Sequence, residues 1–378
     1  MSEETKKGRI DKWMKGGEAP IWLLQIHPTN ACNLNCRFCW RGGDDERNPE
    51  ELSKEKWLSI IEEACKSDVK KITFSGGGEP TLRRDVLLKG SKIMEKHRKS
   101  PPDIENDLIT NGTAFDEELI KNFVKRKWTS ITFSIHGTTS ETDDFIKNRK
   151  GALERTVKNI KFFNKWKEKE GTELPRFTVH TVLMKHNYDE ILPMYKLCED
   201  LNISTYRIRI VNEGIGSRFF PVNEEIVQTM EEQVEKVREQ AENSDVTVKQ
   251  EFSIEEIKNQ VEDEKDENFE GNVDCLEKLG ERRTICPKPF SELVILADGS
   301  ANPCCVAAES QYHQDMEGDP EHIDNIKEKS LEEVWKGEKI QSLRERMKRG
   351  ELPRECENFC TSDLEYKIEK DVLLEDKW

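Results

Sequence analysis

Short apolar runs alternate with longer amphipathic stretches between residues 21 and 213. The short runs are rich in β-branched and aromatic residues, which predicts strands, whereas the longer stretches repeat apolar residues at helical spacing. Strands are predicted at residues 22–27, 71–75, 107–110, 130–135, 177–183 and 205–211. Helices are predicted at residues 55–66, 85–99, 116–127, 152–167 and 188–201. This alternation is typical of βα units, so the sequence predicts an α/β fold around a parallel sheet.

The pattern changes in the last part of the chain. Residues 224–272 are densely charged and predict a final helix followed by a connecting segment. A strand at residues 292–296 then runs into Asp298-Gly299, which predicts a hairpin, and a helix is predicted over residues 330–349. We therefore expect an N-terminal lead (1–20), a barrel (21–215), a charged helical connector (216–285) and a small C-terminal domain (286–378).

Composition narrows the possible functions. The 60 basic and 76 acidic side chains give a net charge of -16, which argues against general nucleic-acid binding because phosphates would be repelled. The charged N-terminus lacks an apolar signal core, and no apolar stretch is long enough to span a bilayer, so we expect a cytoplasmic protein. Eleven cysteines in that compartment indicate metal binding rather than a disulfide framework.

Three of these cysteines are closely spaced: Cys32, Cys36 and Cys39. At the cysteine frequency of this chain, such a fixed triple arises by chance in roughly one chain in a hundred. A structural zinc ion is the alternative, but it needs four ligands and commonly uses paired Cys-x2-Cys knuckles. Three thiolates on one loop instead suit an iron-sulfur cluster with one iron left open.

A glycine run follows the second predicted strand. Gly76, Gly77 and Gly78 let the backbone approach a ligand closely, and Glu79 places a carboxylate beside them. Taken with the cysteine triple, this Gly-Gly-Glu-Pro segment resembles the radical S-adenosylmethionine (radical SAM) superfamily. In that family the cluster loop follows the first strand and the glycine motif follows the second.

The resemblance implies a partial (β/α)6 barrel and a ligand set. Cys32, Cys36 and Cys39 would hold a [4Fe-4S] cluster whose fourth iron binds S-adenosylmethionine, with Phe38 shielding it. One electron from a reductant such as ferredoxin or flavodoxin would then yield a 5'-deoxyadenosyl radical. The SAM-binding residues implied by the family's pattern are Gly76, Gly77, Gly78, Glu79, Asn111, Gly112 and Ser134.

One further segment follows the family's pattern with a change. Ser134-Ile135-His136-Gly137 and the later Arg149 resemble the Ser-x-Asp-Gly and downstream arginine of the SPASM branch, where the arginine pairs with the SAM carboxylate. Because His136 replaces the usual aspartate, His136 and Arg149 are only candidate catalytic residues. His180 on the fifth strand is a further candidate base, with a core role as its alternative.

A second group of cysteines lies near the carboxyl end: Cys286, Cys304, Cys356 and Cys360. The spacing resembles the auxiliary-cluster domain of the SPASM and Twitch branch, and implies one auxiliary iron-sulfur cluster, expected to be [4Fe-4S]. Cys275 or Cys305 is an alternative ligand, and a structural zinc ion is the alternative occupant.

We therefore predict a radical SAM oxidoreductase that removes a substrate hydrogen and, with the auxiliary cluster, oxidises or joins a small molecule. Two alternatives remain open at this point: a peptide-modifying maturase, and a non-catalytic zinc or iron-sulfur electron-transfer protein.

Overall fold

The computed structural model describes residues 5–39, 50–98, 104–211, 223–255, 257–258, 286–310 and 323–349. Its strands in these segments form a single sheet in the order β10-β9-β8-β1-β2-β3-β4-β5-β6-β7. The strands are β1 (Leu23–Ile26), β2 (Lys71–Phe74), β3 (Glu105–Thr110), β4 (Ser130–Ser134), β5 (Arg176–Leu183), β6 (Thr205–Ile210), β7 (Thr247–Gln250), β8 (Glu292–Ile295), β9 (Ser300–Asn302) and β10 (Asp324–Asn325).

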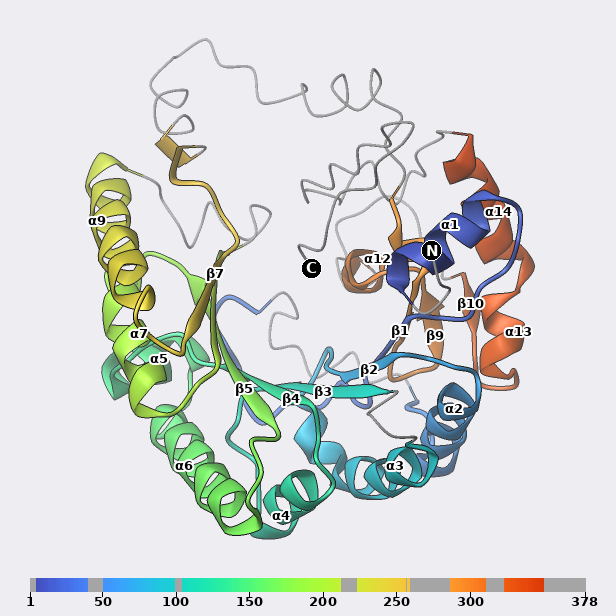
Figure 1. Cartoon of the computed structure of the whole chain (residues 1–378), viewed down its shortest axis with the longest axis horizontal. Coiled ribbons are helices and arrows are strands. Elements are labelled where there is room, and N and C mark those ends of the chain that lie inside the picture. Colours follow the sequence, from blue (N-terminus) through green and yellow to red (C-terminus); the bar gives the residue numbers. More distant parts are fainter. Residues whose placement is uncertain are drawn as a thin grey trace.

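The run from β8 through β1 to β7 is parallel throughout, and β9 and β10 continue it in antiparallel fashion. The sheet is curved, and the helices that follow its strands line the convex side (Figure 1). The helices up to the seventh strand are α1 (Lys6–Met14), α2 (Lys54–Lys66), α3 (Arg84–His97), α4 (Glu117–Lys125), α5 (Ser140–Lys147), α6 (Ala152–Glu170), α7 (Ile191–Asp200) and α9 (Glu224–Ala241).

Aromatic packing fixes which face of each strand meets the helices. On α6, Phe163 lies against Phe133 of β4 and Phe177 of β5, with ring centroids 6.3 and 5.6 Å apart. All three rings are fully buried. Because successive side chains of a strand point to opposite faces, the residues between these positions face the concave side of the sheet.

The six predicted strands and five predicted helices are present, and the parallel α/β fold is confirmed. Three local expectations were incomplete or wrong. The short helix α5 was missed, and the segment expected to be a helical connector contains the strand β7 after α9. The single helix expected at residues 330–349 is two helices, α13 (Leu331–Trp335) and α14 (Glu338–Lys348), because the extended backbone of Gly337 ends one and begins the other.

The predicted Asp-Gly hairpin is confirmed: β8 and β9 pair antiparallel, and Gly299 has a φ of +89° in the turn. The flanking elements are η2 (Lys288–Phe290) before β8 and α12 (Cys305–Ser310) after β9. The N-terminal lead also has structure, since Trp13 of α1 packs against Trp335 and Arg344. The two ends of the described chain therefore pack together.

Candidate functional site

The cysteine loop leaves the carboxyl end of β1 and packs directly on the glycine loop that follows β2. The amide of Gly78 donates to the carbonyl of Thr29 at 3.1 Å, and the amide of Glu79 donates to the carbonyl of Ala31 at 2.8 Å. A Cβ atom on Gly78 would lie 2.1 Å from the oxygen of Ala31. The predicted glycine run is thus required for the close approach of these two loops.

Glu79 joins the glycine loop to the end of β3. Its buried carboxylate accepts hydrogen bonds from the amide and hydroxyl of Thr81 at 3.0 and 2.6 Å. It also accepts from the Thr110 hydroxyl at 2.7 Å and the Asn111 amide at 2.8 Å. In this arrangement Glu79 positions two loops, which is a role beyond the SAM contact expected from the motif.

We expect Glu79→Gln to lower the free energy of unfolding by about 2 kcal/mol. One carboxylate oxygen of Glu79 would become an amide nitrogen, which cannot accept the hydrogen bonds that Glu79 now accepts from the groups named above. Thermal unfolding of the cluster-free protein measures this. Glu154→Gln, at an exposed position of α6, is the control and should cost less than about 0.5 kcal/mol. Equal costs for both variants would contradict the positioning role.

Asn33, between Cys32 and Cys36, anchors the cysteine loop to the loop after β3. Its side-chain amide donates to the Thr113 hydroxyl at 2.7 Å, and its carbonyl accepts from the Asn111 amide group at 2.9 Å. Asn111 was predicted as a SAM-binding residue, whereas Asn33 was missed. The following Gly112 has a φ of +77°, and a Cβ there would lie 2.6 Å from Thr156.

The missed helix α5 supports the other side of the cysteine loop. Arg37 donates from its backbone amide to the carbonyl of Ile146 at 2.9 Å and from Nε to the carbonyl of Phe145 at 2.8 Å. Its guanidinium also lies over the Phe145 ring, 4.2 Å from the centroid. The last carbonyls of α5 are thereby satisfied by the cysteine loop itself.

A buried ion pair lies on α5 close to Cys36. Nζ of Lys147 is 2.9 Å from Oδ2 of Asp143, and both side chains are almost fully buried. The other carboxylate oxygen of Asp143 accepts from the His136 amide at 2.8 Å. Burial, with the nearby Cys39, raises the pKa of Cys36 to about 12, and the charge of Lys147 acts in the opposite direction.

Arg149, the predicted partner of the SAM carboxylate, is exposed just beyond α5, whereas Lys147 is the buried cation of this segment. Ser134 ends β4 with its side chain on the concave side. His136 is buried, and its Nδ1 accepts from the Val182 amide at 3.2 Å. Burial and the charge of Lys147 hold the pKa of His136 far below its usual range, which makes it a weak base here.

The second cysteine group is partly described. Cys286 precedes η2, whereas Cys304 and Cys305 follow β9, so the hairpin returns the chain toward Cys286. Nζ of Lys288 is 3.7 Å from the sulfur of Cys305. Burial raises the pKa of Cys304, and the nearby Cys305 and Cys286 add to the effect. Cys356, Cys360 and Cys275 lie outside the described residues.

Both cysteine groups fall within known families. The family model of the radical SAM superfamily matches residues 26–198, which include the cysteine and glycine loops. The chain belongs to the radical SAM superfamily. A second family model, for the SPASM iron-sulfur cluster-binding domain, matches residues 286–361 of this radical SAM protein. The predicted family and its cofactors, a [4Fe-4S] cluster with S-adenosylmethionine and an auxiliary iron-sulfur cluster, are confirmed.

Two curated relatives come from Methanosarcina barkeri. An Fe-coproporphyrin III synthase is 25% identical over 320 residues, covering 83% of this chain and 72% of the relative. An AdoMet-dependent heme synthase is 30% identical over 187 residues, covering 49% of each chain, so that match spans about half the relative's length.

Solved structures share the fold of this radical SAM protein. Streptococcus suis SuiB bound to its precursor peptide SuiA superposes with a TM-score of 0.63 at 17% identity, covering 89% of this chain and 70% of SuiB. The enzyme anSMEcpe with bound AdoMet and the Cp18Cys peptide gives a TM-score of 0.59 at 17% identity, covering 89% of this chain and 86% of anSMEcpe. These likenesses establish the fold.

The three cysteines of the radical SAM loop lie near one another in the described structure. Among the described residues, no three cysteine, histidine or acidic side chains converge on one metal position. A four-iron cluster places its cysteine ligands on separate irons, so the sulfurs need only surround it. Cys32, Cys36 and Cys39 share one loop, and Cys39 and Cys32 are close enough to influence the pKa of Cys36. Their binding of a cluster stays a prediction.

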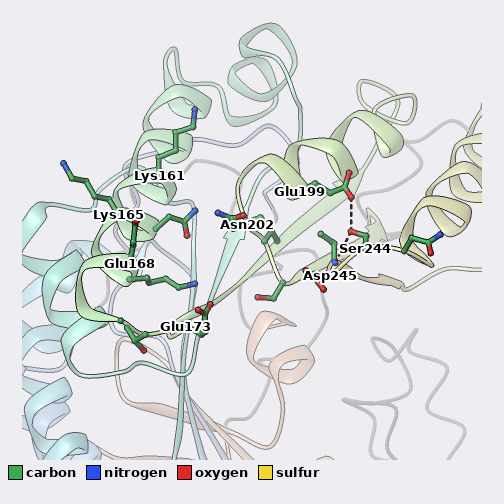
Figure 2. Close-up of a pocket in the computed structure, with 16 residues that line it drawn as sticks. Lys161, Lys165, Glu168, Glu173, Glu199, Asn202, Ser244 and Asp245 are labelled. Atoms are coloured by element: carbon green, nitrogen blue, oxygen red, sulfur yellow. Dashed lines mark hydrogen bonds between the residues drawn. The ribbon is translucent and has the colours of Figure 1, made fainter.

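A polar cavity of about 1100 Å³ lies elsewhere, beside the amino ends of β5, β6 and β7 (Figure 2). Its lining mixes charges, including Lys161, Lys165, Glu168 and Glu173, and the Ser244 hydroxyl donates to Glu199 at 2.9 Å within it. Parallel barrels carry their functional loops at the carboxyl ends of the strands, so this cavity is separate from the candidate site. None of the described helices is long and apolar enough to cross a membrane.

Proposed function

We propose that this chain is a radical SAM enzyme that removes a hydrogen atom from a tetrapyrrole. The observation that carries the enzymatic part is the packing of Gly78 and Glu79 on the cysteine loop, which builds one site from segments about forty residues apart. The names of the curated relatives support the substrate class, since both act in tetrapyrrole synthesis and one aligns over most of this chain.

When bound, the cluster and S-adenosylmethionine supply a 5'-deoxyadenosyl radical that takes the hydrogen atom. The chain's own residues hold and shape the site. Cys32, Cys36 and Cys39 would bind the cluster, and the glycine loop, which Gly78 allows to pack on the cysteine loop, would hold the methionyl group of S-adenosylmethionine beside it. Phe38 packs edge-on against the His136 ring, with centroids 4.9 Å apart, and so joins the cysteine loop to the end of β4.

The second cysteine group supports an oxidation as the net reaction. β8, which follows Cys286, pairs directly with β1, which carries the first cysteine loop. Because β1 and β8 are parallel, Cys286 lies beyond the amino end of this strand pair and the first cysteine loop beyond its carboxyl end. An auxiliary cluster at the second cysteine group would accept the electron that leaves the substrate radical. A peptide maturase is the less favoured alternative. Its support is the structure of SuiB with a bound precursor peptide, and at 17% identity the similarity to SuiB concerns the fold alone.

The test is anaerobic cleavage of S-adenosylmethionine. We expect the reconstituted protein with a strong reductant to form 5'-deoxyadenosine, measured by mass spectrometry, and Cys36→Ala to form none above the protein-free background. Cys65→Ala, a half-buried cysteine of α2, is the matched control and should keep wild-type formation. Equal formation by Cys36→Ala and wild type, or none by wild-type protein that contains iron and sulfide, would overturn the proposal.

A further inference from the structure

Beyond the cysteine and glycine loops, four side chains form a surface on the concave face of β5, β6 and β7, which we call the basic wall. It consists of His180, Arg207, Arg209 and Lys249. His180 pairs in register with Arg207, and Arg207 pairs with Lys249, so these three form one row across the strands. Arg209 lies one step nearer the carboxyl end of β6, opposite Val182.

Strand alternation places this row on the concave face. On β5, Phe177 and Val179 are buried on the helix side, and His180 lies on the opposite face. On β6, Tyr206 and Ile208 are buried, and Arg207 and Arg209 alternate with them. The wall therefore faces the inside of the curved sheet rather than the helices.

The charge of the wall contrasts with that of the chain, whose net charge is -16. Nε of Arg207 is 2.9 Å from Glu251, which compensates one of the three cations of the wall. His180 adds no charge, because burial and the neighbouring Arg209 and Arg207 lower its pKa to about 3. The wall with Glu251 therefore keeps an excess of positive charge, which favours an anionic ligand.

His180 also has unused hydrogen-bonding capacity. Its Nε2 is buried, and within the described part of the chain it has no hydrogen-bond partner. Burying a polar atom without a hydrogen-bond partner is unfavourable. A ligand that reaches the row from the concave side would supply the missing partner.

The wall lies beside the candidate site. Ser134, at the end of β4, pairs in register with His180. His180 is close enough to His136 to lower the pKa of His136, and Phe38 of the cysteine loop packs on His136. Because parallel strands present their carboxyl ends at one rim, Arg209 shares that rim with the cysteine loop.

We propose that the basic wall binds carboxylate groups of the substrate and holds the tetrapyrrole by its acidic side chains. This inference rests on the function proposed above and narrows its substrate to carboxylated tetrapyrroles. Guanidinium groups match carboxylates in geometry and charge.

Coproporphyrin III, which carries four carboxylates, and its uncharged tetramethyl ester are the probes. Each is titrated anaerobically into the full chain reconstituted with cluster and S-adenosylmethionine, and binding is followed by the porphyrin absorbance. We expect the acid to bind at least ten-fold more tightly than the ester. Arg207→Gln/Arg209→Gln should weaken binding of the acid at least ten-fold, and Lys249→Gln, at an exposed position, about two- to five-fold.

Arg176→Gln is the matched control, because Arg176 is an exposed arginine at the amino end of β5. It should bind the acid within two-fold of wild type. The proposal is overturned if the wild-type chain does not bind the acid, if the ester binds as tightly as the acid, or if the arginine double variant binds like wild type.

A second assay measures 5'-deoxyadenosine formed without porphyrin, and it tests the proposed function independently of carboxylate binding. We expect the arginine double variant to keep this formation within two-fold of wild type. If that variant loses both porphyrin binding and cleavage, the arginines serve the S-adenosylmethionine site and the carboxylate assignment is overturned, while the proposed function stands. If wild-type protein forms no 5'-deoxyadenosine, the proposed function itself fails.

Discussion

Gly78→Ala is expected to destabilise the folded chain by about 3 kcal/mol and to prevent loading of the first cluster, because the added methyl carbon would lie 2.1 Å from the Ala31 oxygen. That oxygen also accepts the Glu79 amide, so the backbone cannot yield without losing this bond. Urea unfolding of the cluster-free protein measures the stability. Iron and sulfide content after reconstitution measures the loading.

Gly171→Ala is the control variant, because it strains the backbone without creating a clash. Gly171 ends α6 with a φ of +59°, but no atom lies within 4 Å of the position of a Cβ. It should therefore cost about 1 kcal/mol through its left-handed backbone alone and leave cluster loading unchanged. If Gly78→Ala behaves like Gly171→Ala in both measurements, the close approach of the two loops is not a requirement of the site.

Asp143→Asn is expected to lower the free energy of unfolding by about 3–5 kcal/mol. The asparagine can still accept the His136 amide, but Lys147 is left as a buried charge without its counter-ion. Replacing both residues, as Asp143→Asn with Lys147→Met, should return stability to within about 2 kcal/mol of wild type, because no lone buried charge remains. Urea unfolding of wild type, Asp143→Asn, Lys147→Met and the double variant gives the coupling between the two positions.

The exposed ion pair of Glu117 and Lys121 on α4 is the control, with the two groups 2.7 Å apart. Glu117→Gln should cost less than about 0.5 kcal/mol, since solvent screens that pair. If the losses of unfolding free energy caused by the Asp143 and Lys147 substitutions add in the double variant, the two buried charges do not stabilise each other, and this prediction is wrong.

Periodicity and turn chemistry were sufficient to predict the central part of the fold. The strands from β1 to β6 carry β-branched or aromatic residues in short runs, and the Asp298-Gly299 turn specified the hairpin. α5 was missed because it is only eight residues long and carries a helix-capping Thr139 inside a polar run that is also typical of a loop. β7 was missed because it lies at the edge of the sheet in a densely charged segment, without an apolar alternation.

The site was predictable where a residue's role follows from its local motif. The glycines and cysteines are of this kind, since spacing and backbone freedom belong to the sequence itself. Asn33, Arg37 and Lys147 were not predicted, because their contacts come from segments far along the chain that only the folded sheet brings together. Whether Ser134, Asn111, Arg149 and the outlying Cys356 and Cys360 bind the cofactors stays a prediction.

The pairing of β1 with β8 has a consequence for the order in which the protein folds. Leu23 of β1 lies opposite Glu292 of β8. β1 leads into the cysteine loop, and its neighbour β8 is synthesised only after most of the chain. Until then β1 is an edge strand, paired on one side with β2 alone. Contacts of such long sequence separation form slowly, so maturation of the first cluster is expected to wait for the C-terminal segment during translation.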